Sequence, residues 1–472
     1  MRDLIISMLL ICATTMVSAA QPKANNSFKV ADKSQFDAAM QRVAPGDEIV
    51  LANGEWRDME LAITTSGTAQ DKIYIRGEQP DKVIIGGASQ IKIGADHIHL
   101  YNLTFNGCVA TSPTRKGHIV DFQHNRREAN YSTISDCSFD ACVPDDKSYD
   151  DVWINLYGTH NTVEHCYMGN KDNKGLYIVV WHKNAKADHH TIRNNYFYRP
   201  KSHNREENGQ EAIRIGDSSN SLTNSSTRVE NNFFYRCNGE IEIISIKSGD
   251  NTIHGNTFLE CVGCVTLRHG NNNTISQNLF LANNTPRAGG VRVINRGHRI
   301  FDNYFYGQIS GNERAAISIQ LGIENGALNE YDPVVDVEIS RNTMVECSEN
   351  FSFGVGSRGT VVARDVTLSQ NLVVTSRTST SRLIDDNNTD TSGIGFEESH
   401  LEGRDGALTG SGFIAATYER STISVAGVEI PQVLVDPILA TQPTIGAPKI
   451  DLDQIATPSN CGPRWSGWLR PY

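Results

Sequence analysis

The feature that most constrains the fold is a short phrase that returns along most of the chain. A polar pair, often containing asparagine, precedes an apolar residue in "NNYF", "NNFF", "GNTF", "QNLF" and "DNYF". From Phe234 onward the phrase returns at Phe258, Phe280 and Phe305, at intervals of 24, 22 and 25 residues. Related phrases, separated by wider gaps, end at Phe105, Phe139, Phe197, Met344 and Val373. The wider gaps are those expected of the same unit with loops inserted.

A period of this length, built from short β-rich segments and turns rich in asparagine or glycine, predicts a right-handed parallel β-helix. One coil cannot bury its own apolar side, but stacked coils bury a continuous row of phenylalanine and isoleucine. Equivalent asparagines can then form a ladder of amide hydrogen bonds along the stack. We therefore expect an all-β chain with a single elongated domain over residues 21–472, rather than several compact domains.

Both ends of such a stack need a cover, because an open coil exposes unpaired strand edges. Residues 28–47 are predicted to form the N-terminal cap, in which Ser34 begins a short helix. That helix carries Phe36, Ala39, Met40 and Val43 on one side. The phrase disappears after about Leu383, so residues 383–472 are expected to be irregular strands and loops that pack on the far end.

The first 20 residues have the pattern of a secretory signal peptide. Arg2 precedes an apolar run from Leu4 to Met16, and small residues close the segment at Ala19 and Ala20. The run is too short to span a bilayer comfortably, and no later segment is apolar enough to do so. The mature protein is therefore expected to be exported, to the periplasm or the medium, with no membrane partner.

Charge and cysteine content narrow the choice of partners. The formal net charge of −11 argues against a nucleic-acid partner. One of the ten cysteines lies in the signal segment, which leaves an odd number for a disulfide framework. The pattern Phe-x-x-Cys recurs at Cys108, Cys142, Cys237 and Cys261. These residues are predicted to form an interior column of small apolar side chains rather than a metal site, although neighbouring pairs could oxidise after export.

The segment "GEIEIISIK", residues 239–247, is unusual for a strand. Glu240 and Glu242 alternate with isoleucines and so are expected to point to one face, and Lys247 follows five residues after the second acid. The alternation is expected to break at Ser245 and Ile246, which turns Lys247 toward the same surface. A solvated salt-bridge face is the alternative interpretation.

Stacking the neighbouring coils, about 4.8 Å apart, adds basic side chains to this surface. Alignment of residues 209–218, 239–248, 263–272 and 290–299 puts Arg268 in the column of Ile244 and Arg214. The same alignment puts Arg292 two coils beyond Glu242, and Asn208 at the start of the preceding strand can add a neutral oxygen.

This combination of groups suits one kind of reaction. Neighbouring carboxylates repel unless a cation lies between them, and oxygen ligands favour Ca²⁺. A cation beside the carboxylate of a uronic acid lowers the cost of removing the proton at C5. A lysine can take that proton when neighbouring positive charges favour its neutral form, and the 4-O-glycosidic bond then breaks. The acids are thus expected to be metal ligands, and the lysine the base.

The order Asn208, Glu240, Glu242, Lys247 and Arg268 on a β-helix resembles polysaccharide lyase family 6, the alginate lyases and chondroitinase B. The resemblance includes the steps of five and 21 residues from Glu242 to Lys247 and from Lys247 to Arg268, and the segments "NGQEAIRIG" and "LRHGNNN". It extends over nearly the whole mature chain.

The resemblance implies a role for each of these positions. Lys247 would be the Brønsted base, and Arg268 the acid or the stabiliser of the leaving oxygen. Ca²⁺ would be bound by Asn208, Glu240 and Glu242. His269 is implied to contact the sugar, and Arg214 and Arg292 are weaker candidates for substrate binding. Single-domain members are the better match, because this chain has no room for a second β-helix.

Three functions remain open from the sequence. The first is an alginate lyase, whose partner is an acidic polysaccharide of mannuronate and guluronate. The second is a chondroitinase B-like lyase that acts on dermatan sulfate. The third is a β-helix that binds carbohydrate without catalysis, which would have no need of Lys247 and Arg268. A glycoside hydrolase is disfavoured, because hydrolysis uses two carboxylic residues and a water rather than a base beside a metal site.

Overall fold

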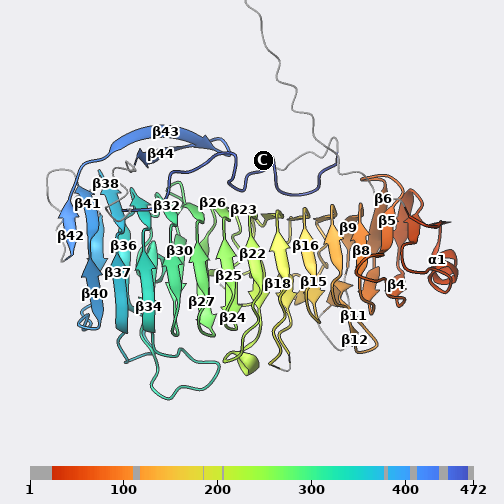
Figure 1. Ribbon diagram of the computed structural model, residues 1–472, viewed down its shortest axis with the longest axis horizontal. Helices are drawn as coiled ribbons and strands as arrows, with labels where there is room; N and C mark the ends of the chain where they lie inside the picture. Colours follow the sequence, from red (N-terminus) through yellow and green to blue (C-terminus); the bar gives the residue numbers. More distant parts are fainter. Residues whose placement is uncertain are drawn as a thin grey trace, which may run out of the picture.

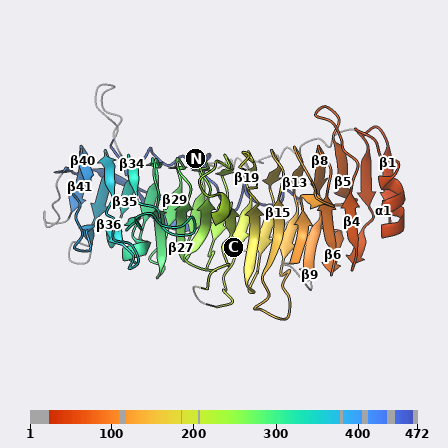
Figure 2. The same ribbon diagram turned by 90° about the horizontal axis from the view of Figure 1, so that it is seen from below.

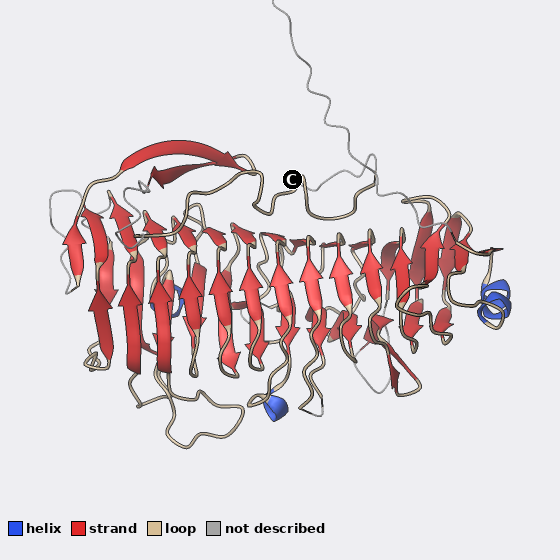
Figure 3. Cartoon of the chain, viewed as in Figure 1, coloured by secondary structure: helices blue, strands red, loops and turns tan. Residues whose placement is uncertain are grey.

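The computed structural model describes residues 24–109, 117–183, 185–204, 207–376, 381–403, 412–434 and 445–465. Its strands form three long parallel sheets that run the length of an elongated molecule (Figure 1). Each sheet takes about one strand from every coil, so strands adjacent in a sheet come from successive coils. The expected parallel β-helix is therefore confirmed, as is the all-β class, and helices are confined to short segments (Figure 3).

The first sheet contains β1 (Ser27–Val30), β2 (Glu48–Leu51), β5 (Ile73–Gly77), β8 (Ile98–Tyr101), β13 (Thr133–Ser135), β16 (Thr162–Glu164), β19 (Thr191–Arg193), β22 (Arg228–Glu230), β25 (Thr252–His254), β28 (Thr274–Ser276), β31 (Arg299–Phe301), β34 (Val335–Ser340), β37 (Arg364–Ser369) and β40 (Ile394–Glu397). The second sheet contains β4 (Glu60–Ile63), β7 (Gln90–Ile93), β10 (Gly117–Asp121), β15 (Asp151–Leu156), β18 (Gly175–Val180), β21 (Ile213–Ile215), β24 (Glu242–Lys247), β27 (Gly263–His269), β30 (Ala288–Val293), β33 (Ile317–Gln320), β36 (Glu349–Val355) and β39 (Arg382–Asp385). The third sheet contains β3 (Gly54–Arg57), β6 (Val83–Gly87), β9 (Thr104–Cys108), β14 (Ser138–Asp140), β17 (Tyr167–Gly169), β20 (Tyr196–Tyr198), β23 (Phe233–Tyr235), β26 (Thr257–Leu259), β29 (Leu279–Leu281), β32 (Tyr304–Tyr306), β35 (Thr343–Val345), β38 (Leu372–Thr375), β41 (Ser399–Gly403) and β42 (Phe413–Ala415). Two hairpins, β11 (Gln123–His124) with β12 (Arg127–Glu128) and β43 (Glu419–Val425) with β44 (Val428–Leu434), lie outside these sheets.

The repeated phrase places its phenylalanines on the third sheet, where they stack along the interior. Ring centroids of Phe197, Phe234, Phe258, Phe280 and Phe305 lie 4.7, 4.7, 4.9 and 4.8 Å apart in sequence order, with nearly parallel planes. All five side chains belong to one continuous core cluster that runs through the stack. The period that is visible in the sequence is thus the repeat of a buried aromatic column.

The asparagine that precedes each phenylalanine forms the predicted ladder. The N–H of Asn256 donates to Oδ1 of Asn278 at 3.0 Å, and the N–H of Asn278 donates to Oδ1 of Asn303 at the same distance. The side-chain amide of Asn278 also donates to the Ile253 carbonyl at 2.9 Å. The ladder continues through Asn195, Asn232, Asn256, Asn278, Asn303, Asn342 and Asn371. Each buried amide is therefore satisfied by the next coil, which fixes the register between coils.

The nine cysteines of the described residues are buried and form no disulfide bonds, in agreement with an interior thiol column. Cys108 and Cys142 are hydrogen-bonded neighbours, and so are Cys237 and Cys261. Burial raises the pKa of the Cys142 thiol and that of the Cys237 thiol well above the usual range of a cysteine. Both thiols therefore stay protonated and unreactive.

At the N-terminal end, helix α1 (Lys33–Met40) covers the first coil (Figure 2). Phe36, Ala39 and Met40 form the buried side of this helix, as predicted. The predicted helix cap is wrong by two residues: Asp32 is the N-cap, and its Oδ1 accepts the N–H of Gln35 at 2.8 Å. A carboxylate at this position is a good acceptor for the free N–H groups of the first turn.

The prediction for residues 383–472 needs correction. β40, β41 and β42 continue the first and third sheets, and the chain then turns back along the molecule instead of covering its far end (Figure 1). Near the end of the tail, Arg464 pairs with Asp136 at 2.6 Å, and Trp465 Nε1 donates to Oδ1 of Asn102 at 3.0 Å. The final residues of "NCGPRWSGWLRPY", 466–472, lie outside the described residues.

The tail covers an apolar outer face of the third sheet. Val425, Ile430 and Val433 of the β43–β44 hairpin belong to one cluster with Tyr304 and Leu372 of the sheet. Tyr304 also donates a hydrogen bond from its hydroxyl to the Pro431 carbonyl. The outward side chains of this sheet are apolar because the tail, rather than solvent, lies against them.

The predicted signal peptide, residues 1–20, lies outside the described residues. Within the described residues, none of the helices has the length and apolar character needed to cross a membrane.

Asn278→Ala should weaken the fold. The substitution removes the acceptor of the buried Asn256 N–H and one donor to the Ile253 carbonyl, so we expect the free energy of unfolding to fall by about 1–3 kcal/mol. Asn106→Ala, at an exposed position of β9, is the control and should change it by less than about 0.5 kcal/mol. Urea unfolding followed by circular dichroism measures both, and equal effects would contradict a special role for the ladder.

Buried histidines should make stability depend on pH. His298 Nδ1 accepts the N–H of Asn273 at 3.1 Å, and burial lowers the pKa of His298 from 6.5 to about 4. The unfolded chain therefore binds a proton that the folded chain excludes between about pH 4 and pH 6.5. This contribution is complete above pH 6.5 and is lost as the pH falls toward 4, by on the order of 3 kcal/mol.

His298→Asn keeps an acceptor for the Asn273 N–H but removes the titration. Urea unfolding across the same pH window should show a shallower fall in stability for this variant than for the unchanged protein. An identical slope for both would mean that His298 is not excluded from protonation in the folded state.

Candidate functional site

The candidate site lies on the outward face of the second sheet, around β21, β24, β27 and β30. Ile244 and Ile246 point into the core, as do Val265 and Leu267 of the next coil, so the residues between them point outward. In this register Arg214 pairs with Ser245, Ser245 with Thr266 and Thr266 with Arg292. The predicted column is therefore wrong: Arg214 aligns with Ser245, and Ile244 aligns with Val265 rather than with Arg268.

The strand that carries Lys247 is irregular in a different place from the one predicted. Ile243 and Ile244 both join the core, so the alternation breaks there instead of at Ser245 and Ile246. The break brings Glu242 and Ser245 to one side, and the Ser245 hydroxyl donates a hydrogen bond to Oε2 of Glu242. Lys247 consequently lies on the outward face and is partly exposed.

A second irregularity brings the two predicted catalytic residues together. The register shifts after Ile246, so that Lys247 pairs with His269 and Arg268 becomes the extra residue of the bulge. β-bulges redirect a side chain without interrupting the sheet. His269 is buried, and burial, followed by the charges of Arg268 and Lys247, lowers the pKa of His269 to about 3. Its ring is therefore neutral near pH 7 and can hydrogen-bond a sugar hydroxyl.

Two buried carboxylates adjoin these residues. Glu240 and Glu242 are each 6% exposed, although Glu240 precedes the strand and Glu242 begins it. Oε1 of Glu240 accepts the N–H groups of Gly209 and Gln210 at 2.8 and 2.9 Å. Burial raises the pKa of Glu240 to about 9, and the nearby carboxylates of Glu211 and Glu242 add to the shift. The three acids are thus close enough to repel one another.

Glu211 was missed by the sequence reasoning. It is 1% exposed, and its carboxylate oxygens face the carboxyl of Glu240, with no N–H or hydroxyl donor of the described residues bound to them. An acid in this state calls for a cation, because an unpaired buried charge is costly. The available signal was its position in "NGQEAIRIG", but the alignment placed it beside Ile241 and so gave no reason to select it.

Two arginines lie on the other side of Glu242. Arg268 Nε is 3.5 Å and Arg292 Nη1 is 3.6 Å from Oε1 of Glu242. Arg292 is only 4% exposed and also donates to Glu313 at 2.9 Å. The structure therefore joins Glu242, Arg268 and Arg292 in one charged group that draws on three successive coils.

Tyr331 is a second residue that the sequence reasoning missed. The guanidinium of Arg268 lies 4.2 Å from the centre of its ring, and Arg292 donates to its hydroxyl at 3.1 Å. Tyr331 belongs to the segment between β33 and β34, which extends from the lower edge of the stack (Figure 3). Leu328 of the same segment accepts a hydrogen bond from Ser221, close to the 3-10 helix η1 (Ser218–Asn220). No periodic signal marks such a residue, because it lies in a loop.

The remaining predicted residues lie at the margins of this group. Arg214, one coil before Lys247, places its guanidinium 5.2 Å from the ring of Trp181, and its Nε has no protein partner. Asn208 is exposed and is adjacent to Gly209, whose N–H binds Glu240. The structure therefore brings the backbone at Asn208 to the acidic group, while its side chain faces solvent.

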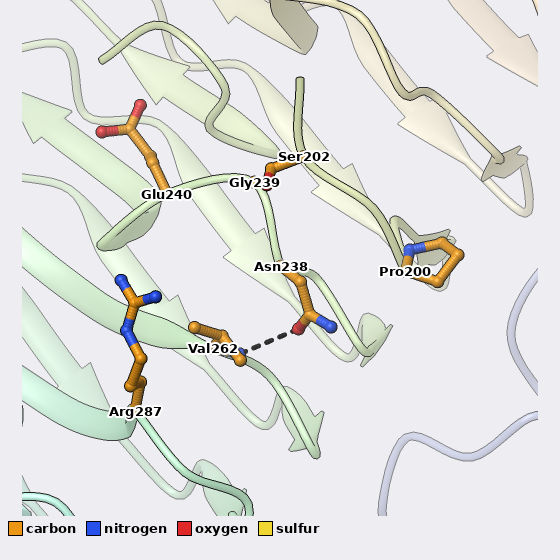
Figure 4. A pocket seen from close by; sticks show the side chains of 7 residues that line it. All are labelled: Pro200, Ser202, Asn238, Gly239, Glu240, Val262 and Arg287. Atoms are coloured by element: carbon orange, nitrogen blue, oxygen red, sulfur yellow. Dashed lines mark hydrogen bonds between the residues drawn. The ribbon is translucent and has the colours of Figure 1, made fainter. Parts of the chain in front are cut away.

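A pocket of about 260 Å³ adjoins Glu240, and neither Lys247 nor Arg268 lines it. Its walls come from Pro200, Ser202, Asn238, Gly239, Glu240, Val262 and Arg287 (Figure 4). Asn238 Oδ1 accepts the N–H of Val262 at 3.1 Å and so braces the turns of two coils. We assign the reacting groups to the open face instead, because that face carries the lysine and the arginines.

Comparison with known proteins indicates the family of the chain. The family model described as Chondroitinase B matches residues 30–392. None of the curated proteins matches the chain.

Among solved structures, the PL6 family alginate lyase AlyGC is 32% identical, with a TM-score of 0.83 over 94% of this chain. This chain spans 59% of the length of AlyGC. A mannuronic acid specific polysaccharide family 6 lyase from human gut microbiota is 28% identical, with a TM-score of 0.74, over 83% of this chain and 91% of that one. A PL6 alginate lyase in complex with a trisaccharide is 23% identical, with a TM-score of 0.71, over 94% of this chain and 96% of that one, and supports the fold alone.

The family match covers well over half of the chain, and the structural likeness extends through the coils that carry the charged group. The chain therefore belongs to the chondroitinase B family, that is, to polysaccharide lyase family 6.

Proposed function

We propose that this protein is an exported polysaccharide lyase that cleaves alginate by β-elimination. The observation that carries the proposal is the outward face on which Lys247 and Arg268 meet at one bulge, beside the buried Glu240 and Glu242. A module that only binds carbohydrate does not need a lysine and an arginine beside buried carboxyl groups. The similarity to the alginate lyase AlyGC and to the mannuronic acid specific lyase supports alginate as the substrate class.

In the proposed reaction Lys247 acts as the base. Its amine takes the C5 proton of a uronate. The electrons of that C–H bond form the C4–C5 double bond, and the C4–O4 bond breaks. Arg268 lies beside Lys247 and is proposed to supply a proton to the leaving oxygen or to stabilise its charge. No water is consumed, so the product carries an unsaturated end.

The outer side chains are proposed to hold the sugar. His269 is neutral and pairs with Lys247 across the bulge, so it can orient a hydroxyl near the base. Arg292 and Arg214 lie one coil on either side of the β24–β27 pair and are proposed to bind carboxylates of the polymer. Nε of each of these arginines is buried and lacks a protein partner.

Calcium is the proposed cofactor, held by Asn208, Glu240 and Glu242, with Glu211 as a further acid. The fit rests on the buried Glu211 oxygens, which no N–H or hydroxyl donor of the described residues binds, and on Glu240, whose pKa is raised by burial and then by the nearby carboxylates of Glu211 and Glu242. When bound, the ion neutralises the substrate carboxylate and so stabilises the charge that develops on proton loss. Within the described residues, no group of three acidic, histidine or cysteine side chains could hold a metal ion as they stand. The amide of Asn208, whose side chain faces solvent, would have to turn toward the acids to complete the site.

Lys247→Ala and Arg268→Ala should each abolish the rise in ultraviolet absorbance that accompanies formation of the C4–C5 double bond in alginate. Loss of the base alone is expected to lower kcat by about 100-fold or more. Lys92→Ala is the control, because Lys92 is a cation on β7 of the same sheet that pairs with Glu60. Near-normal turnover by Lys247→Ala would contradict the base assignment.

The same absorbance assay decides the substrate class. Alginate should give the signal, and dermatan sulfate should not. Cleavage of dermatan sulfate alone would favour the chondroitinase-like alternative. Binding of either polymer without any double bond would favour the carbohydrate-binding alternative.

Glu242→Gln and Glu240→Gln should weaken binding of Ca²⁺, measured by isothermal titration calorimetry on the purified protein. The loss is expected to be about 10-fold or more in affinity, because each variant removes one charged ligand. Glu60→Gln, an exposed acid on β4 of the same sheet, is the matched control. Activity that is unaffected both by these variants and by a chelator would remove calcium from the reaction.

A further inference from the structure

The turns between the third and second sheets contain a column of buried side chains. Most members of this column are cysteines, but two coils contribute a lysine and an arginine instead. Cys108 and Cys142 are neighbours in this column, as are Cys237 and Cys261. Between the two pairs, Lys171 and Arg199 approach the column closely enough to influence the pKa of Cys142 and Cys237, respectively. Both cations are essentially fully buried, at 0% and 1% exposure. A long cation therefore stands where other coils have a small thiol.

The two cations have different partners. Lys171 forms a buried ion pair with Asp151. Arg199, by contrast, forms no ion pair with any of the described residues. It donates from Nη1 to the Gly175 and Gln210 carbonyls, each at 2.9 Å, and from Nη2 to the Asn173 carbonyl at 2.6 Å. Burial of this charge is costly, and Asp151 and Glu211 offset the cost only from beyond ion-pair distance, so its retention calls for a purpose beyond packing.

The partner that links Arg199 to the site is Gln210. Nη2 of Arg199 also approaches Oε1 of Gln210 at 3.4 Å, and the same oxygen accepts the N–H of His203 at 2.7 Å. The amide nitrogen of Gln210 donates to the carbonyls of Asn204 and Glu207 at 2.8 and 3.0 Å. The side chain of Gln210 thus holds both described parts of the segment that leads to Asn208.

The backbone of the same residue reaches the acidic group. The N–H groups of Gly209 and Gln210 both donate to Oε1 of Glu240. Arg199 therefore acts on Glu240 through one residue, Gln210. Arg199 donates to the carbonyl and side-chain oxygen of Gln210, and the N–H of Gln210 donates to the Glu240 carboxylate. Two N–H donors orient a carboxylate only while their own peptide units are fixed.

We propose that Arg199 is a positioning residue, which orients Glu240 and the backbone at Asn208 by fixing Gln210. Its effect on catalysis rests on the lyase function proposed above. Its effect on the segment does not, because the hydrogen bonds of Gly209 and Gln210 exist in the protein alone. The adjacent cation Lys171 contacts Asp151 instead, and its hydrogen-bonded connection toward Glu240 runs through Asp151, Asn173 and Arg199 itself.

Arg199→Met keeps an apolar side chain of similar length and removes the donors. We expect faster hydrogen exchange at the amides of His203, Gly209 and Gln210, and a Ca²⁺ affinity about 10- to 100-fold lower. On alginate, kcat should fall over the same range while KM changes little. Gln210→Ala, which leaves the buried cation in place, should produce the same pattern.

Lys171→Met is the matched control, because it also removes one buried cation from the same column. It should lower the melting temperature without faster exchange at Gly209 and Gln210 and without loss of Ca²⁺ affinity. Gln210→Glu should restore much of the exchange protection relative to Gln210→Ala, because its oxygens still accept from Arg199 and His203.

The outcomes separate the two proposals. If Arg199→Met and Gln210→Ala lower the melting temperature but leave exchange at Gly209 and Gln210 unchanged, the positioning role is wrong. If Arg199→Met does not fold, Gln210→Ala decides by the same readout. If the unchanged protein lacks lyase activity on alginate, the proposed function fails, and the exchange measurements still decide the role of Arg199.

Discussion

The fixed register between successive coils is the constraint on which the rest of the structure depends. The asparagine ladder sets this register, because each side-chain amide binds both the next asparagine and the backbone of the preceding coil. Strands are short, many of only three residues, so few backbone hydrogen bonds hold any one pair. A buried column of amides supplies the specificity that short strands lack, because an unsatisfied amide makes a slipped register costly. Once the register is set, the outward columns of all three sheets follow.

The candidate site uses that register to collect like charges. Glu211, Glu240 and Glu242 are buried near one another, and Arg268 and Arg292 approach from the next two coils. In water the acids would repel one another and move apart. The stack of coils holds them together, at a cost to the stability of the fold. Two departures from regular pairing, at Ile243 and after Ile246, put the acids and the lysine on the same face. The site is thus a local irregularity supported by a regular stack on both sides.

Coverage of the outer surfaces differs from sheet to sheet. The tail lies over the third sheet and is fastened near the N-terminal half of the stack by Arg464 to Asp136 and by Trp465 to Asn102. The outward face of the second sheet carries the charged group, and the loop that contains Tyr331 borders this group. This division explains why one outer face is rich in tyrosine and leucine while another carries arginine, lysine and glutamate.

The sequence by itself determined the coil, the buried column of phenylalanine, the asparagine ladder and the surface to which Glu240, Glu242, Lys247 and Arg268 belong. Each of these is a periodic property, and period is visible without coordinates. Only the tertiary structure decided where the alternation breaks, that Arg214 aligns with Ser245, and that the tail returns along the third sheet. It alone brought Glu211, Tyr331 and Arg199 to the site. These features depend on contacts between loops, bulges and distant segments, and such contacts leave no repeat in the chain.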